Sequence, residues 1–406
     1  MDFSCDLTLA PESTGAWNRQ HHFSIASNLF HMKLLWIPHQ DWPSLDGQRE
    51  RWLLDSWPDS GDELHILTWQ SARDLGKPLS SFGWSTFRQG RITVHSRPRI
   101  PNVMGRHVMG RFGKDSARGL WANEQLFRFY ARQLVRNLGI DVLVYGLGHK
   151  AVGLPPFDLP IAKVFDCLDL ITYQDVEAEY IANSDMVLCT SRVLVDRLQR
   201  FGKHGVYIPN GVSMSRIARG ERDRTRTELG LQGKQVVSLI GLTSSRSLFF
   251  VDALALAARQ APDIVFLVVG GGDLLHPIVE RCRQLGLPFA ATGWVPNNQI
   301  GHYFAATDLG LYPGDSNAYF DAACPLKVLE YTAARRPVVA TDLEELRRLA
   351  FPNVRLAQPD PERFAAAVIT SLREPTEFAD VSGFEWCTLA QTVRQTLVKL
   401  VQEQRQ

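Results

Sequence analysis

Short apolar runs alternate with helical patterns along the whole chain. Each run is short enough to form one buried strand, and the runs are residues 34–38, 64–68, 92–95, 142–145, 162–165, 186–189, 206–208, 236–240, 264–269, 309–312 and 338–340. Strands that alternate with helices predict parallel sheets in an α/β fold. The runs fall into two series of about equal length, so we predict two Rossmann-like domains.

A turn and a charged stretch separate the two series. The turn signal Pro-Asn-Gly at 209–211 is followed by a stretch of charged residues that begins at Arg216 and is predicted to be solvated. Near the end, apolar residues at four-residue spacing from Leu389 to Val401 predict a helix with one apolar stripe. We therefore expect a poorly ordered extension at 1–31, an N-terminal domain at 32–208, a linker at 209–233, a C-terminal domain at 234–380 and a C-terminal helix at 381–406.

The amino-acid composition is typical of a globular protein. The 406 residues are 45% hydrophobic and 21% charged, which is typical of a globular chain and argues against disorder. The six cysteines are scattered without a Cys-x-x-Cys pair, so neither a disulfide framework nor a zinc site is indicated, and a reducing cytoplasm fits best. No apolar run approaches the roughly 20 residues of a membrane helix, and the first residues do not form a signal peptide.

Glycines follow the apolar run at 264–269. Gly270, Gly271 and Gly272 stand where backbone N–H groups and a helix N-terminus could approach a phosphate closely. A tight turn without any ligand is an equally good interpretation. A dinucleotide fingerprint would need a further glycine at the position of Leu275, so an NAD site is disfavoured.

Lys327 and Glu330 form a stronger pattern. On a helix these two residues share a face because they are three positions apart. The lysine could neutralise a diphosphate, and the glutamate could accept hydrogen bonds from ribose hydroxyls. The simpler alternative is an ordinary surface ion pair.

The surrounding sequence resembles a known family. The segment 325–341 is similar to the donor-binding signature of GT-B glycosyltransferases of the large group 1 (family 4) clan, and the segments 208–212, 293–296 and 300–313 match the same clan. The resemblance implies two facing Rossmann-like domains, with the C-terminal helix returning to the first. It also implies a nucleotide-diphosphate sugar donor in the second domain and an acceptor in the first. The donor-binding residues that it indicates are Gly241, Ser244, Arg246, Gly270, Gly271, Gly272, Asp321, Pro325, Leu326, Lys327 and Glu330.

Two departures from the family pattern affect the mechanism. Retaining members carry a second acid eight positions before Glu330, where this chain has Ala322 and the nearest acid is Asp321. Whether the transfer is retaining or inverting therefore stays open. Arg246 is the only cation in a loop where the family has a pair of cations, although it could still stabilise a leaving diphosphate. The chain has no Asp-x-Asp, so we expect no obligatory metal and no other cofactor.

Candidate catalytic residues lie in the first half. Asp166 and Asp169 follow the run at 162–165, and an inverting transfer needs a general base to take the acceptor proton. The segment 185–191 resembles GT-B relatives that include the xanthan-type glucuronosyltransferase, and that resemblance implies Asp169 as the base. Asp166 is the alternative, and either aspartate could instead cap a helix. His149, after the run at 142–145, is a further candidate for contact with the donor sugar.

Positive charge gathers between residues 88 and 136. This segment holds eleven Arg and Lys residues against two acids, a net charge of +9, so the rest of the chain carries −8. With its interleaved aromatics it could contact an anionic membrane surface or a lipid-diphosphate acceptor, through Arg106, Arg111, Arg118, Arg128 and Arg132. A solvated basic helix with an ordinary apolar stripe is the alternative, and no nucleic-acid partner is expected.

These features predict a cytoplasmic hexosyltransferase, peripheral on the inner face of the membrane. It would transfer a sugar from a nucleotide-diphosphate donor to a sugar or lipid-linked acceptor, in exopolysaccharide, cell-envelope or glycolipid synthesis. A nucleotide-sugar epimerase can share the fold and would convert the donor without an acceptor. A degenerate, non-catalytic scaffold of the same fold is the third hypothesis.

Overall fold

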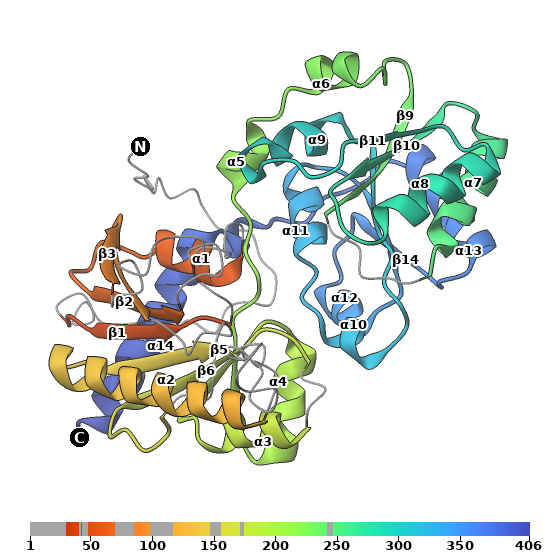
Figure 1. Ribbon diagram of the computed structural model, residues 1–406. Coiled ribbons are helices and arrows are strands. Elements are labelled where there is room, and N and C mark those ends of the chain that lie inside the picture. Colours follow the sequence, from red (N-terminus) through yellow and green to blue (C-terminus); the bar gives the residue numbers. More distant parts are fainter. Residues whose placement is uncertain are drawn as a thin grey trace, which may run out of the picture.

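The computed structural model describes residues 30–39, 42, 48–69, 85–97, 117–146, 156–170, 174–241 and 247–406, without the side chains of 117–123 and 174–176. Each of its two lobes is built around one sheet, and a thin crossing joins the lobes (Figure 1). We call the lobe around the first sheet the first lobe and the other the second lobe. All but residues 30 and 31 of the predicted extension lie outside the described residues.

The first sheet has the strand order β3-β4-β2-β1-β5-β6-β7-β8. Neighbouring strands are parallel except for the edge pair of β3 and β4. The strands are β1 (Lys33–Ile37), β2 (Glu63–Trp69), β3 (Ser85–Gln89), β4 (Ile92–Arg97), β5 (Val142–Gly146), β6 (Ala162–Cys167), β7 (Met186–Cys189) and β8 (Gly205–Tyr207). The chain runs from β1 outward to one side and then returns to the other, so the strand order reverses between β1 and β5.

Helices cover both faces of the first sheet. One face packs against α1 (Arg49–Asp55) and the last helix, α14 (Trp386–Gln404). The opposite face packs against α2 (Ala117–Leu138), α3 (Gln174–Ala182) and α4 (Arg192–Leu198). The short η6 (Gln199–Phe201) follows α4 and contacts α3 and α4. Covering on both faces explains why the central strands appear in the sequence as unbroken apolar runs.

The second sheet has the order β11-β10-β9-β12-β13-β14, with every neighbouring pair parallel. Its strands are β9 (Gln235–Ile240), β10 (Ile264–Val269), β11 (Phe289–Ala291), β12 (Leu309–Tyr312), β13 (Val338–Thr341) and β14 (Val354–Ala357). One face packs against α7 (Phe249–Gln260), α8 (Leu275–Leu285) and α13 (Pro361–Arg373). The other packs against α5 (Met214–Ala218), α9 (Ile300–Ala306), α11 (Leu326–Ala333) and α12 (Glu344–Leu349).

Shorter elements complete the second lobe and the crossing. These are α6 (Arg222–Glu228), η7 (Asn297–Gln299), α10 (Ala318–Ala322) and η8 (Ser382–Phe384). Over the part of the chain that the structure describes, no helix has both the length and the apolar character needed to span a membrane.

The α/β fold predicted from the apolar runs is confirmed, and each run contributes a strand. Three strands had no such signal. β3 has the sequence Ser-Thr-Phe-Arg-Gln and is exposed along its whole length, because it is an antiparallel edge strand. β11 and β14 are the outermost strands of the second sheet and are only partly covered, so they need no unbroken apolar run.

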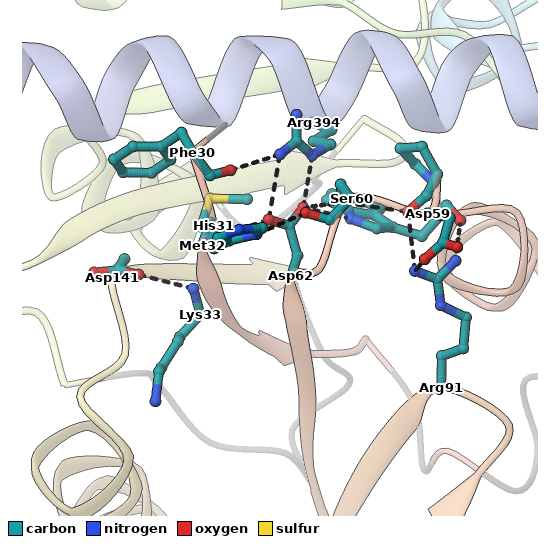
Figure 2. A network of polar contacts seen from close by, with 12 residues as sticks. Phe30, His31, Met32, Lys33, Asp59, Ser60, Asp62, Arg91, Asp141 and Arg394 are labelled. Carbon is teal, nitrogen blue, oxygen red and sulfur yellow. Dashed lines mark hydrogen bonds and ion pairs between the residues drawn. The ribbon is translucent and has the colours of Figure 1, made fainter. Parts of the chain in front are cut away.

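A buried ion pair fixes the last helix to the first sheet. Arg394 of α14 donates through Nε to Asp62 at 2.7 Å, and the two side chains are 5% and 0% exposed (Figure 2). Asp62 also accepts hydrogen bonds from Trp57, Ser60 and the Met32 N–H. Burial alone would raise the pKa of Asp62, but Arg394 and the other donors outweigh burial and lower it. The predicted return of the C-terminal helix to the first domain is therefore confirmed.

The chain crosses between the lobes twice, and the two crossings run side by side. The Val212 N–H donates to the Phe384 carbonyl at 2.8 Å, and the Trp386 N–H donates to the Val212 carbonyl at 3.3 Å. Gly211 packs against the Trp386 ring so closely that a Cβ there would lie 2.6 Å from it. A glycine is therefore required where the first crossing passes the start of α14.

We predict that Asp62→Asn lowers the free energy of unfolding by about 3–5 kcal/mol, because it leaves the Arg394 charge buried without its counter-charge. The neighbouring Glu63→Gln is the matched control. Glu63 pairs with Lys33 on an exposed surface, 52% and 41% open, so its loss should cost at most about 1 kcal/mol. Urea unfolding would measure both variants, and equal losses would contradict the role given to the buried pair.

Candidate functional site

Two glycine turns meet at the carboxyl edge of the second sheet. Gly241 follows β9 and Gly270 follows β10, with φ angles of +111° and +128°. The Gly241 N–H donates to the Val269 carbonyl at 2.8 Å. A Cβ on Gly270 would lie 2.9 Å from the Gly241 carbonyl oxygen. Side chains at either position would be strained, so this edge is formed by main chain alone. The Gly270 N–H, like that of Gly241, donates to a main-chain carbonyl, that of Gly293 at 2.9 Å.

The lysine and the glutamate of the predicted donor signature lie beside these turns on α11. Lys327 donates through Nζ to Glu330 Oε2 at 2.6 Å, so the two residues share a helix face as their spacing predicts. They form the ion pair that was the alternative interpretation. A Cβ on Gly241 would lie 2.8 Å from Lys327 Cε, which places the lysine side chain directly against the glycine turn. The Glu330 side chain is 1% exposed, so its charge needs cations close by.

Arg216 is a second cation that pairs with Glu330, and this pairing was not predicted from the sequence. It comes from α5, pairs with Glu330 Oε1 and donates to the Asn297 side chain. The prediction that this charged stretch is solvated is wrong for Arg216, whose side chain is 12% exposed. No motif surrounds Arg216. Only the need of a buried carboxylate for a second cation could have pointed to it.

Asp321 is the acid nearest to Ala322, the position where retaining relatives carry their second carboxylate. Asp321 accepts a hydrogen bond from the Glu344 N–H at 3.0 Å, at the start of α12. Its neighbour Ala322 is buried in a core cluster of the first lobe. Pro325 accepts from the first turn of α11, and Leu326 packs against first-lobe residues. This part of the second lobe thus forms an interface with the first lobe as well as the start of the helix that carries Glu330.

Four ionisable side chains meet at the carboxyl edge of the first sheet. His39 follows β1, and its Nδ1 and backbone N–H lie 2.5 and 3.1 Å from Oε1 of the buried Glu50. Arg49, beside Glu50 on α1, pairs through Nε with Asp166 at 3.3 Å. Gly146 ends β5, and a Cβ there would lie only 3.1 Å from the His39 Cβ. The cluster therefore lies where the strand order reverses, the usual ligand position in open α/β sheets.

Burial and charge shift the pKa values in this cluster. Burial alone lowers the pKa of His39, but Glu50 and the nearby aspartates outweigh burial and raise it above its ordinary value. Burial also raises the pKa of Asp166, against the opposing effect of the Arg49 charge. Asp166 is fully buried, and its pairing with Arg49 balances its charge within the protein.

Asp169 is the more accessible of the two aspartates. Its side chain keeps contact with solvent, yet the surrounding protein desolvates the carboxyl and raises its pKa to about 6. His39 and a hydrogen bond with Tyr319 act in the opposite direction. Tyr319 belongs to α10 of the second lobe, so Asp169 lies where the lobes meet. A carboxyl with this pKa is ionised at neutral pH and is a stronger base than an ordinary aspartate.

The remaining predicted acceptor and donor side chains either form ion pairs or lie outside the described residues. Two arginines of the basic segment form ion pairs, Arg128 with Glu124 at 2.7 Å and Arg132 with Asp158 at 2.8 Å. The described residues hold no group of three His, Cys, Asp or Glu side chains that could bind a metal ion. The predicted residues that lie outside the described residues, or whose side chain does, are Ser244, Arg246, His149, Arg106, Arg111 and Arg118.

Residues 235–374 match the family model of the group 1 glycosyl transferases. A Bacillus subtilis (strain 168) protein with the provisional name teichuronic acid biosynthesis glycosyltransferase TuaH is 29% identical over 186 residues, which cover 45% of this chain and 46% of that protein. The D-inositol 3-phosphate glycosyltransferase of Segniliparus rotundus is 28% identical over 216 residues, 49% of this chain and 47% of that one. The chain thus covers slightly less than half of the length of each relative.

Two solved structures share the fold over 92% of this chain. HepE from Anabaena, in complex with UDP, has a TM-score of 0.59 at 16% identity, with 98% of its chain covered. The UDP-forming α,α-trehalose-phosphate synthase of Burkholderia vietnamiensis has a TM-score of 0.65 at 13% identity, with 100% covered. The chain has the GT-B fold, and its second lobe carries a group 1 glycosyltransferase domain. The predicted family resemblance is thereby confirmed for residues 235–374, whereas for the rest of the chain it is the fold that is shared. The likeness to the xanthan-type enzyme stays a prediction.

We predict that Gly270→Ala destabilises the second lobe by about 1–3 kcal/mol, because the new Cβ meets the Gly241 backbone and the residue keeps a left-handed φ. Gly271→Ala is the matched control. Its Cβ would lie no closer than 3.7 Å to any neighbour, so we expect a change within about 0.5 kcal/mol. Thermal unfolding would compare the two, and a Gly270→Ala variant as stable as Gly271→Ala would refute the close approach of the turns.

Proposed function

We propose that this chain transfers a sugar from a nucleotide-diphosphate donor to an acceptor hydroxyl. The observation that carries the proposal is Lys327 lying against the Gly241 turn and paired with the buried Glu330. A glycine turn at the end of a strand, with a lysine beside it, suits a diphosphate because no side chain stands between the ligand and the main chain. A buried carboxylate one turn further along suits the ribose hydroxyls. HepE, the structural neighbour with UDP, supports the choice of ligand class.

The first lobe would hold the acceptor and supply the base. In the proposed reaction the acceptor oxygen forms a bond to the anomeric carbon while the bond from that carbon to the diphosphate breaks. The acceptor proton passes to Asp169, whose pKa of about 6 suits a general base at neutral pH. The negative charge that develops on the leaving diphosphate is stabilised by Lys327. No metal is required in this scheme.

We infer an inverting transfer from the residues around Glu330. Ala322 occupies the position of the second acid of retaining relatives and is buried in the first-lobe core. The adjacent Asp321 is engaged with the Glu344 N–H. A single base on the first lobe, Asp169, is the simplest arrangement that remains. The anomeric configuration of the product, read by NMR, would overturn this inference if it were retained.

The acceptor would be a sugar or a lipid-linked sugar of cell-envelope or polysaccharide synthesis, and the enzyme would work in the cytoplasm. Contact of the segment 88–136 with an anionic membrane belongs to this proposal. Since Arg128 and Arg132 already form ion pairs, we infer that such contact relies more on exposed arginines such as Arg88 and Arg136. Failure of the protein to bind phosphatidylglycerol vesicles would exclude it.

We predict that one nucleoside diphosphate among UDP, GDP, ADP and dTDP stabilises the protein selectively. Ligand at one hundred times its dissociation constant should add roughly 2.7 kcal/mol, a clear rise in melting temperature. The rise should be the same with and without Mg²⁺. No response to any of the four would favour the non-catalytic scaffold over the enzyme.

We predict that Asp169→Asn lowers kcat by about 100-fold or more but leaves stabilisation by the nucleotide intact. In the wild type, kcat should rise as the pH increases through about 6, because the base must be ionised, and the variant should lack this rise. Asp158→Asn, an exposed aspartate of the same lobe, is the control and should keep full activity. Conversion of the donor without any acceptor would instead indicate the epimerase.

A further inference from the structure

Arg216 touches three different parts of the molecule. Besides Glu330 and Asn297 of the second lobe, its guanidinium carbon lies 5.2 Å from the centre of the Trp52 ring. Trp52 belongs to α1 of the first lobe and stacks on Trp386 of α14, with 6.4 Å between ring centres and 11° between ring planes. One largely covered cation therefore joins the Glu330 carboxylate to an aromatic pair of the opposite lobe.

The two oxygens of Glu330 have different cationic partners. Oε2 accepts from Lys327 and Oε1 from Arg216. A diphosphate beside the Gly241 turn would draw Lys327 away from Glu330. The buried carboxylate would then depend on Arg216 to balance its charge, since a buried charge without a partner is costly. Arg216 thus allows Lys327 to turn toward the donor.

The helix that carries Trp52 also carries the cluster of the first lobe. Arg49 and Glu50 lie on α1 and contact Asp166 and His39. A shift of α1 against the second lobe would therefore move these groups together with Trp52. The contact between Arg216 and Trp52 links the position of this helix to the state of Glu330.

We propose that Arg216 is a positioning residue that couples donor binding at Glu330 to the docking of α1 against the second lobe. The inference rests on the proposed donor role of Glu330. Because energetic coupling is reciprocal, weakening the first-lobe end of the contact must weaken donor binding in the second lobe. Trp52 is thus expected to affect the affinity for a ligand that binds on the opposite lobe.

The test measures the dissociation constant of whichever of UDP, GDP, ADP and dTDP stabilises the wild type most. Arg216→Gln should weaken binding on the order of 30-fold or more, because it removes one partner of a buried charge pair. Trp52→Leu should weaken it on the order of 5-fold or more. Arg216→Lys should recover part of the loss. Arg219→Gln is the control, since this exposed arginine ends the same helix and should leave the affinity unchanged.

The outcomes separate the two proposals. If none of the four diphosphates binds the wild type, the proposed function fails and this inference fails with it. If one binds the wild type and binds Arg216→Gln or Trp52→Leu equally well, only the coupling is refuted. A purely structural role would lower the melting temperature of the free protein without changing the affinity. In the transfer reaction, Arg216→Gln and Trp52→Leu should each raise the KM for the donor.

Discussion

The ion pair between Asp62 and Arg394 determines how the two lobes are joined. It is buried, so it forms only when α14 lies across the first sheet, and α14 follows the whole second lobe in the sequence. The chain must therefore cross between the lobes a second time. That return crossing pairs with the first at Val212 and Glu385. A double connection restricts the relative motion of the lobes far more than a single linker would.

Buried carboxylates with partners from other segments lie at the carboxyl edges of both sheets. Glu50, Asp166 and Glu330 are almost completely buried, and each lies against a cationic or titratable partner from another segment. Such groups stabilise a structure only if their partners are held in place, because an isolated buried charge costs several kcal/mol. The site is therefore complete only when α1, α5 and α11 are packed together. Asp169 differs because it keeps contact with solvent and so remains free to exchange a proton.

Periodicity was enough to predict the strands and the two α/β domains, and residue spacing placed Lys327 and Glu330 on one helix face, since these depend on neighbours in the sequence. The GT-B fold was predicted from the resemblance of local motifs to a known family. The edge strand β3 could not be predicted because its exposed residues carry no apolar pattern. Arg216 could not be predicted because its carboxylate partner is 114 residues away. The pairing of His39 with Glu50 likewise depends on how α1 packs beneath β1. Long-range partners of buried charges are set by tertiary packing, which a single sequence does not reveal.

The return of α14 also affects the order in which the protein can fold during synthesis. The first sheet is finished at β8, yet α14, one of the two helices that cover one of its faces, begins roughly 180 residues later. At translation rates of about 5–20 residues per second, α14 is synthesised roughly 9–36 s after β8. During this time the part of the core that α14 covers, which includes β6, would be open to water or to a chaperone. The helices that cover the second sheet are synthesised together with its strands, so the second lobe can reach its final structure while the first is still incomplete.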